Sequence, residues 1–151
     1  MIKFPEKAKQ VVTRPIPDQL IKQRPGGGGK ILSYLSGSTV IDLLNEAFGY
    51  LWSWEQTEQW VQKSEPKFNP KYDKEPVPQG PVAHVKGKLT VYLPQEDGSV
   101  FTIVKTGYGS KAIIGTQMDQ ESIFKAAGTD ALKKAASLLG IGLELYRDED
   151  E

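Results

Sequence analysis

Basic side chains recur at helical spacing near the C-terminal end of the chain. Lys125, Thr129 and Lys133 stand four residues apart, so they form one polar line along the helix that the surrounding pattern predicts. The opposite side of this helix is mostly alanine, which lets a helix lie close to a sheet. A line of lysines on a closely packed helix could hold a polyanion through charge. The alternative is a buried helix whose lysines are only solvated.

A second basic stretch, Arg24-Pro-Gly-Gly-Gly-Gly-Lys30, lies near the N-terminus. Four consecutive glycines make a flexible turn whose backbone can approach a ligand closely. With a basic residue at each end, the stretch is a candidate phosphate-contacting loop, and the alternative is a plain linker. It does not match the phosphate-binding loop of nucleotide hydrolases, because Ile31 follows the lysine where that motif has Ser or Thr.

The residues needed for acid–base, covalent or metal chemistry are scarce. His84 is the only histidine and cysteine is absent, which excludes disulfides and thiolate metal sites. Asp148 and Asp150 lie in an acidic C-terminal stretch where nothing fixes them. Gly107-Tyr-Gly109 lacks the third glycine of a dinucleotide-binding loop. We therefore expect a binding protein and not an enzyme, with no cofactor and no metal.

The charge of the chain is unevenly distributed along its 151 residues. The formal net charge is zero, yet residues 1–34 carry seven basic and two acidic side chains, a net of +5, and residues 148–151 are all acidic. A ligand responds to the local field, so this asymmetry matters more than the sum. No apolar run reaches membrane-spanning length and no signal peptide follows Met1, which predicts a cytoplasmic protein with no membrane contact.

The elements that position these residues can be read from periodicity and turn signals. The patterns predict a basic arm over residues 1–17, a short helix over 18–24, and a helix over 36–49 that Ser38 or Thr39 caps. The long C-terminal helix runs from an N-cap at Asp119 and ends at Gly140. Residues 63–81 are rich in Lys, Glu and Pro and predict either a long loop or a partly disordered excursion.

Three strands separate the two long helices. Residues 51–61 read as the first strand, with Trp52, Trp54 and Trp60 at one parity and therefore on one face. Residues 82–93 alternate strictly and pair with residues 100–108 across an Asp97-Gly98 turn. The prediction is an α+β fold, a three-stranded antiparallel meander with flanking helices in the order helix-strand-strand-strand-helix. Its uncovered face, with the tryptophan row, suggests burial in an oligomer.

Three stretches, in this order, resemble a known family: Arg24-Pro-Gly-Gly-Gly-Gly-Lys30 with Tyr34-Leu-Ser-Gly37; residues 40–49 followed by Trp52-Ser-Trp54; and Thr129-Asp-Ala-Leu-Lys-Lys-Ala135 running on to Gly140-Ile-Gly142 and Tyr146. Together they resemble the single-strand annealing proteins of the Rad fifty-two superfamily. In style the chain is similar to the short bacterial and phage members and to the DNA-damage-response A proteins. The resemblance covers residues 18–146, which form the expected annealing domain. This domain lies between the basic N-terminal arm at residues 1–17 and an acidic tail at residues 147–151.

The resemblance implies ATP-independent binding of single-stranded DNA and pairing of complementary strands in recombination or repair, by a homo-oligomeric ring or filament that can work with other recombination proteins. In that family a basic residue before the glycine loop and a basic pair in the last helix hold the DNA backbone, and these positions match Arg24, Lys133 and Lys134. Lys125 matches a further basic position on the same helix. Lys30 and Lys111 complete the predicted DNA-binding set, with Lys86, Lys88 and Tyr92 as further candidates on the strand hairpin.

Two departures from the family pattern bear on the site. Some relatives have another basic residue after the pair, where this chain has Ala136 and Ser137. The 63–81 loop is longer than in the eukaryotic members. Two other functions stay open at this point: a double-stranded RNA-binding module, which shares the helix-strand-strand-strand-helix order, and a structural oligomer that binds no nucleic acid.

Overall fold

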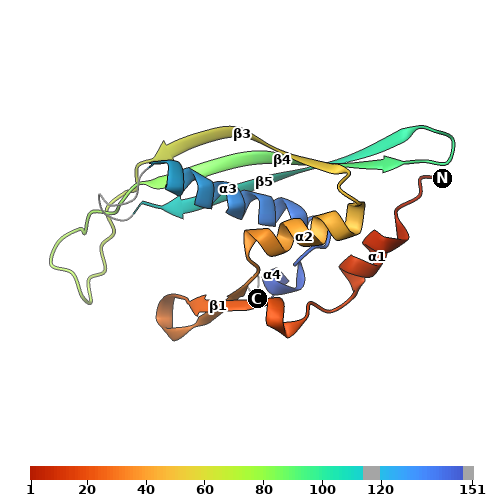
Figure 1. The fold of residues 1–151 in the computed structure, drawn as a ribbon. Coiled ribbons are helices and arrows are strands. Elements are labelled where there is room, and N and C mark those ends of the chain that lie inside the picture. The colour runs from red at the N-terminus through yellow and green to blue at the C-terminus, as the bar shows by residue number, and fades with distance from the viewer. Residues whose placement is uncertain (114–119, 148–151) are drawn as a thin grey trace.

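The computed structural model describes residues 1–113 and 120–147 and has an α+β fold, as predicted (Figure 1). A long antiparallel sheet of three strands, in the order β3-β4-β5, carries helices on one face, and a second sheet pairs β1 with β2. The elements are α1 (Glu6–Thr13), η1 (Asp18–Leu20), β1 (Lys22–Pro25), η2 (Gly27–Gly29), β2 (Ile31–Tyr34), α2 (Gly37–Phe48), β3 (Trp52–Gln62), β4 (Val82–Pro94), β5 (Val100–Ala112), α3 (Gln120–Ser137) and α4 (Glu144–Arg147).

The two long helices begin and end where local chemistry dictates. Ser36, and not the predicted Ser38 or Thr39, caps α2, because its side chain accepts the Thr39 N–H while its own backbone is extended. Gly49 ends α2 in the left-handed conformation, with φ of 59°. Gly140 ends α3 as predicted: its N–H donates to Ser137 O at 2.9 Å and the next N–H donates to Ala136 O at 3.1 Å. The predicted N-cap, Asp119, lies outside the described residues.

The core forms where the apolar face of the sheet meets α3. The strict alternation of β4 buries Val85, Leu89 and Val91 completely, which confirms the predicted strand. The alanine side of α3 packs directly on β5, and Gly107 and Gly109 permit this close approach. A Cβ at Gly107 would lie 2.1 Å from Ala131 O, so only glycine fits at that point.

The tryptophan prediction for β3 is wrong. Trp52 and Trp54 pack against the core beneath the helices, whereas Trp60 pairs with His84 on the opposite face and stacks on it at 5.2 Å between ring centroids. The cause is a β-bulge: Gln56 pairs with Gly87 and Glu58 with Lys86, which leaves one extra residue between them. One extra residue reverses the alternation of the strand beyond it.

Residues 1–17 are folded and do not form the extended basic segment that the sequence predicts. Glu6–Thr13 form α1, which buries Ala8 and Val11 against the core. Arg14 donates two hydrogen bonds to the Glu46 carboxylate at 2.8 and 2.6 Å, which lowers the pKa of Glu46 and raises that of Arg14. The expected helix over 18–24 is instead the 3-10 turn η1 followed by strand β1. The glycine stretch therefore joins β1 and β2 in a hairpin, termed here the β1–β2 hairpin.

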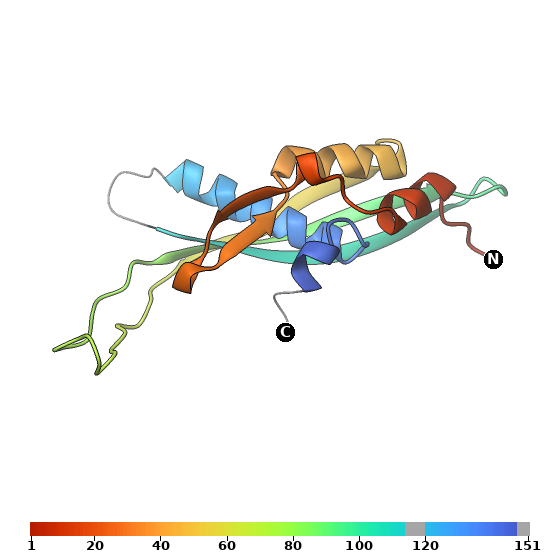
Figure 2. The same ribbon diagram turned by 90° about the horizontal axis from the view of Figure 1, so that it is seen from below.

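Residues 63–81, termed here the arm, extend beyond the end of the long sheet (Figure 2). The arm is not disordered, because Lys67 and Val77 form an antiparallel bridge with two backbone hydrogen bonds of 3.0 and 2.8 Å. At its tip the Asp73 carboxylate accepts the Asn69 N–H at 2.9 Å. Elsewhere, no helix in the described ranges is long and apolar enough to cross a membrane.

Candidate nucleic-acid interface

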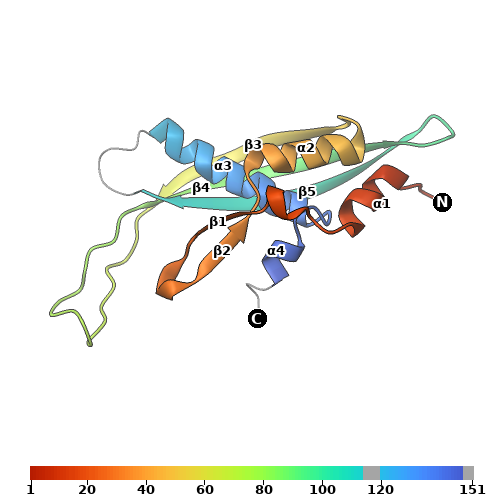
Figure 3. The ribbon, with the colours of Figure 1, turned by 60° about the horizontal axis from the view of Figure 1, so that its bottom comes forward.

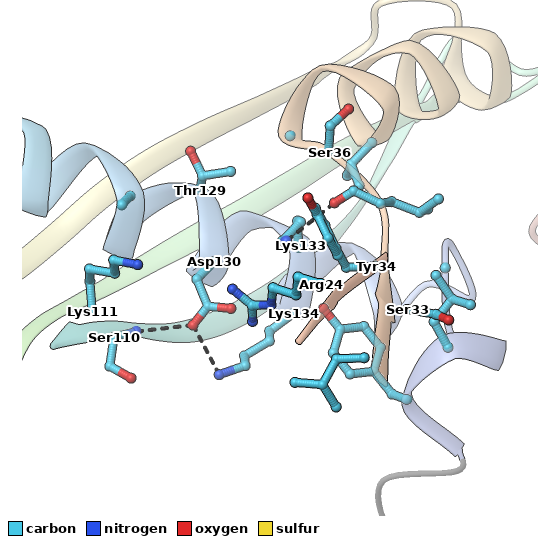
Figure 4. Close-up of a pocket in the computed structure, with 18 of the residues that line it drawn as sticks. Arg24, Ser33, Tyr34, Ser36, Ser110, Lys111, Thr129, Asp130, Lys133 and Lys134 are labelled. Carbon is cyan, nitrogen blue, oxygen red and sulfur yellow. Dashed lines mark hydrogen bonds and ion pairs between the residues drawn. The ribbon is translucent and has the colours of Figure 1, made fainter. Parts of the chain in front are cut away.

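A groove with a volume of about 860 Å³ lies between the β1–β2 hairpin, the start of α2, the end of β5 and the polar side of α3 (Figure 4). Figure 3 shows the hairpin alongside α3 on the helix-bearing side of the sheet. The basic side chains among the described residues that line the groove are Arg24, Lys111, Lys125, Lys133 and Lys134. The structure therefore brings together five of the six residues predicted from sequence. Lys30 is exposed near the tip of the hairpin and is not part of the lining.

Tyr34, on the side of the groove formed by the β1–β2 hairpin, contacts two cations with its ring. The Arg24 guanidinium carbon is 5.4 Å from the centroid of the Tyr34 ring, and Lys133 Nζ is 5.3 Å from the same centroid. Both distances fit cation–π contacts. The ring therefore contacts both cations at the groove wall, and the two positive charges lie close enough to repel each other.

Lys133 is half-buried, so the polar line predicted on α3 is not exposed along its whole length. Its Nζ donates a hydrogen bond of 3.2 Å to the Leu35 carbonyl, which connects α3 to the end of β2. Burial lowers the pKa of Lys133, and the charges of Arg24 and Lys134 act in the same direction, while Asp130 opposes them. Lys125, by contrast, is exposed one turn beyond Thr129.

Asp130 is the acidic member of the groove, and sequence reasoning did not identify it. Its Oδ2 accepts the Ser110 backbone N–H at 3.0 Å and also the Lys134 Nζ at 3.1 Å (Figure 4). Asp130 thus joins α3 to β5 and occupies one of the basic side chains that a phosphate would use. Its position, four residues before Lys134 on a helix, is the usual spacing of such a pair and could have indicated it.

The further DNA-binding candidates on the β4–β5 hairpin lie on the opposite side of the sheet from the groove. They are Lys86, Lys88 and Tyr92. This open face, as we term it, carries Trp60, His84, Lys86, Lys88, Thr90, Tyr92, Val104 and Tyr108. Lys86 Nζ is 3.9 Å from the Glu58 carboxylate and 5.7 Å from the Tyr108 ring centroid. Lys88 faces Glu55 across the strand pair. The lysines of the open face are therefore balanced by carboxylates and do not join the groove.

His84 and the N-terminal charges also lie apart from the groove. His84 Nε2 is buried without a hydrogen-bond partner in the described structure, under the stacked ring of Trp60. Lys7 and Arg14 both contact Glu46, and Lys3 pairs with Glu96. Within residues 1–113 and 120–147, no three His, Asp or Glu side chains are grouped to hold a metal ion.

Comparison with models of known protein families identifies the family to which the chain belongs. Residues 5–151 match the model of the family described as Rad52/22 family double-strand break repair protein. The match spans nearly the whole chain, so this protein belongs to the Rad52/22 family, as the three sequence stretches suggested. A search of curated proteins finds no match to the chain.

Proposed function

We propose that this protein binds single-stranded DNA in the groove and anneals complementary strands, without ATP or a metal ion. The observation that carries the proposal is the convergence of Arg24, Lys111, Lys125, Lys133 and Lys134 on one groove from three separate parts of the chain. Family membership places the chain among double-strand break repair proteins, which supports a role in recombination and repair.

The groove suits annealing because its cations can hold phosphates while leaving base edges free. Lysine and arginine bind the backbone through charge and counterion release and do not read sequence. With the phosphates against Lys133 and Lys134 on α3, the bases of the strand point away from the groove wall. A second strand can then test them by base pairing, and no bond is made or broken in the protein or the DNA.

We further propose that the active species is a homo-oligomer in the cytoplasm of a bacterial or phage-infected cell, with residues 18–146 as its annealing domain. The open face supports this, since Trp60, Val104 and Tyr108 are 39%, 50% and 56% exposed in the single chain. A repeated subunit would align successive grooves along one strand. Other recombination proteins are the expected partners in the cell.

Two double variants that remove the same charge from opposite sides of the sheet test the proposal. Lys125→Ala/Lys134→Ala empties part of the groove, and Lys86→Ala/Lys88→Ala removes two lysines from the open face. The groove variant should weaken binding to single-stranded DNA and reduce the slope of log affinity against log salt by about 1.4, at roughly 0.7 per phosphate contact. The open-face variant should keep the wild-type slope.

The annealing assay uses complementary oligonucleotides in buffer with chelator and without nucleotide. Wild-type protein should speed annealing, and the groove variant should lose most of this acceleration. Equal losses in both double variants would show that the groove is not the binding site. A preference for duplex RNA over single-stranded DNA would favour an RNA-binding module, and a wild-type protein that binds neither would favour a purely structural oligomer.

A further inference from the structure

The arm is an ordered projection that the annealing groove alone does not explain. The hydrogen bonds near its tip are local and hold a turn: besides the Lys67–Val77 bridge, the Tyr72 and Asp73 N–H groups both donate to Asn69 O, at 3.0 and 2.8 Å. None of its apolar side chains belongs to the described core clusters. The side chains of this segment are therefore accessible to another molecule.

The arm exposes two aromatic rings beside lysines. Phe68 and Tyr72 are 52% and 75% exposed, and Lys71 Nζ lies 5.2 Å from the centroid of the Tyr72 ring. Exposed aromatic rings with adjacent cations are the combination by which proteins bind single-stranded nucleic acid, since every base can stack on a ring and every phosphate can accept a cation. The lysines of the arm are Lys63, Lys67, Lys71 and Lys74.

The acidic residues of the arm weaken this cationic character only in part. Four lysines against Glu65, Asp73 and Glu75 leave the arm at a net charge of +1. The Asp73 carboxylate is already engaged by the Asn69 N–H, so it serves the turn. Docking onto a second protein chain would favour a continuous apolar patch. The two rings do not form one, because asparagine, proline and lysine separate them in the sequence.

The base of the arm adjoins one end of the groove. The Ile113 N–H donates to Pro81 O at 2.9 Å, which joins the end of the arm to the end of β5. Lys111, two residues before, lines the groove and pairs with Ala83 at the start of β4. In Figure 1 the arm bends toward the side of the sheet that bears the helices and the β1–β2 hairpin. A strand that leaves the groove past Lys111 therefore meets the arm.

We propose that the arm extends the DNA-binding site, with Phe68 and Tyr72 stacking on bases of the single strand beyond the Lys111 end of the groove. Lys71 moves from the Tyr72 ring to a phosphate as a base takes its place on the ring. The inference rests on the proposed binding of single-stranded DNA and assigns to that site a base-stacking part that the groove, which contacts phosphates, does not supply.

The test pairs a variant of the arm with a change in the DNA. Phe68→Ala/Tyr72→Ala removes both rings, and Phe68→Leu/Tyr72→Leu keeps apolar side chains without an aromatic face. Both substitute exposed residues outside the core, and thermal unfolding should match wild type. The DNA probes are oligodeoxyadenylates of increasing length, and the same strands with abasic sites at the 5′ or the 3′ end.

With long strands both variants should bind about tenfold or more weaker than wild type, since loss of one base–aromatic stack costs about that factor. The slope of log affinity against log salt should stay unchanged, because no charge is lost. Short strands that fill only the groove should bind all three proteins equally. Abasic sites at one end should weaken wild type to the level of the variants and should not weaken the variants further.

Several outcomes would overturn the inference. Wild-type affinity of both variants for long strands would show that the rings make no contact, while the groove binding proposed above would stand. A change in oligomer mass, measured by light scattering, with unchanged affinity per subunit would show that the arm docks on a second copy of the chain. If wild type binds no single-stranded DNA at all, the groove proposal fails first, and this inference fails with it.

Discussion

Lys133 is held by the protein itself before any ligand arrives. Its sequence spacing places it on the polar line of the helix, but the β1–β2 hairpin folds over this part of α3 and supplies both the Leu35 carbonyl and the Tyr34 ring. Periodicity describes a helix by itself and cannot tell which neighbouring element will cover it. Substitution by alanine should therefore affect the position of the hairpin as well as phosphate binding.

The lowered pKa of Lys133 predicts a pH dependence with a definite sign. A DNA phosphate binds the charged amine, so affinity should fall as pH rises through the pKa of Lys133, below the ordinary value of 10.5. The stability of the free protein depends on pH with the opposite sign. Between the lowered pKa of Lys133 in the folded protein and its ordinary pKa of 10.5 in the unfolded chain, the unfolded chain binds the proton that the folded protein has lost. The unfolding free energy therefore increases with pH in this range.

Lys133→Arg is the matched control, because its guanidinium stays charged throughout this range. DNA titrations between neutral and alkaline pH should show the loss in wild type and a flatter profile in the variant. Equal profiles for the two proteins would mean that another group controls the alkaline behaviour.

Asp130 should limit the affinity of the groove, because it occupies Lys134 and brings a negative charge close to any bound phosphate. In Asp130→Asn the amide oxygen can still accept the Ser110 N–H, while Lys134 is released. We expect tighter binding to single-stranded DNA, because Lys134 no longer has to leave its ion pair with Asp130 to reach a phosphate and the carboxylate no longer repels the phosphates. Weaker binding of Asp130→Asn at every salt concentration would instead show that Asp130 organises the site and does not compete with the ligand.

The contact between β5 and α3 determines the position of the groove, because this contact sets how close the lysines of α3 lie to the end of β5. Gly107→Ala would place a Cβ 2.1 Å from Ala131 O and 2.9 Å from the Ala135 Cβ. We expect a loss of roughly 1–3 kcal/mol in unfolding free energy from overpacking. Urea unfolding measures it, with Ser110→Ala, exposed on the same strand, as the control. Equal stabilities would show that α3 can shift away from β5 without cost.

The regular elements could be predicted from sequence, and the irregular ones could not. β4 and the end of α3 follow from alternation and from Gly140, which are local signals. The β1–β2 hairpin was missed because its strands are only four residues each and β1, Lys-Gln-Arg-Pro, has no alternation of apolar side chains. Five groove cations were predicted, whereas Tyr34, Asp130 and Ser110 were not, because their roles depend on contacts between elements that are far apart in the sequence.

At the scale of the whole molecule, charge pairing decides where an anion is attracted. The strongly basic N-terminal region predicted from sequence is largely neutralised by folding, because Lys3, Lys7, Lys9 and Arg14 each contact a carboxylate. On the open face Glu58 pairs with Lys86, and Glu55 lies opposite Lys88 in the strand register. The groove, with five cations and Asp130, keeps an excess of positive charge in a protein of zero net charge.

The exposed side chains of the open face predict self-association through it. Val104→Lys places a charge at a position that is 50% exposed in the single chain, so the fold should persist while any apolar contact between subunits is disrupted. Light scattering coupled to size exclusion should show a lower mass than wild type. Ile41→Lys, on the exposed side of α2, is the control and should keep the wild-type mass. A wild-type monomer at micromolar concentration, with or without DNA, would rule out the oligomer.

The bulge in β3 determines which insertions and deletions this strand can accept. Before it, the strand supplies Trp52 and Trp54 to the core, and beyond it the same strand supplies Trp60 to the open face. Deletion of Thr57 would remove the extra residue and restore strict alternation, with Glu58 still opposite Lys86 on the open face and Gln59 still opposite Val85 on the core side. Single-residue deletions at positions 56–58 should therefore be tolerated better than single-residue insertions there, which would have to widen the bulge or turn the later side chains over.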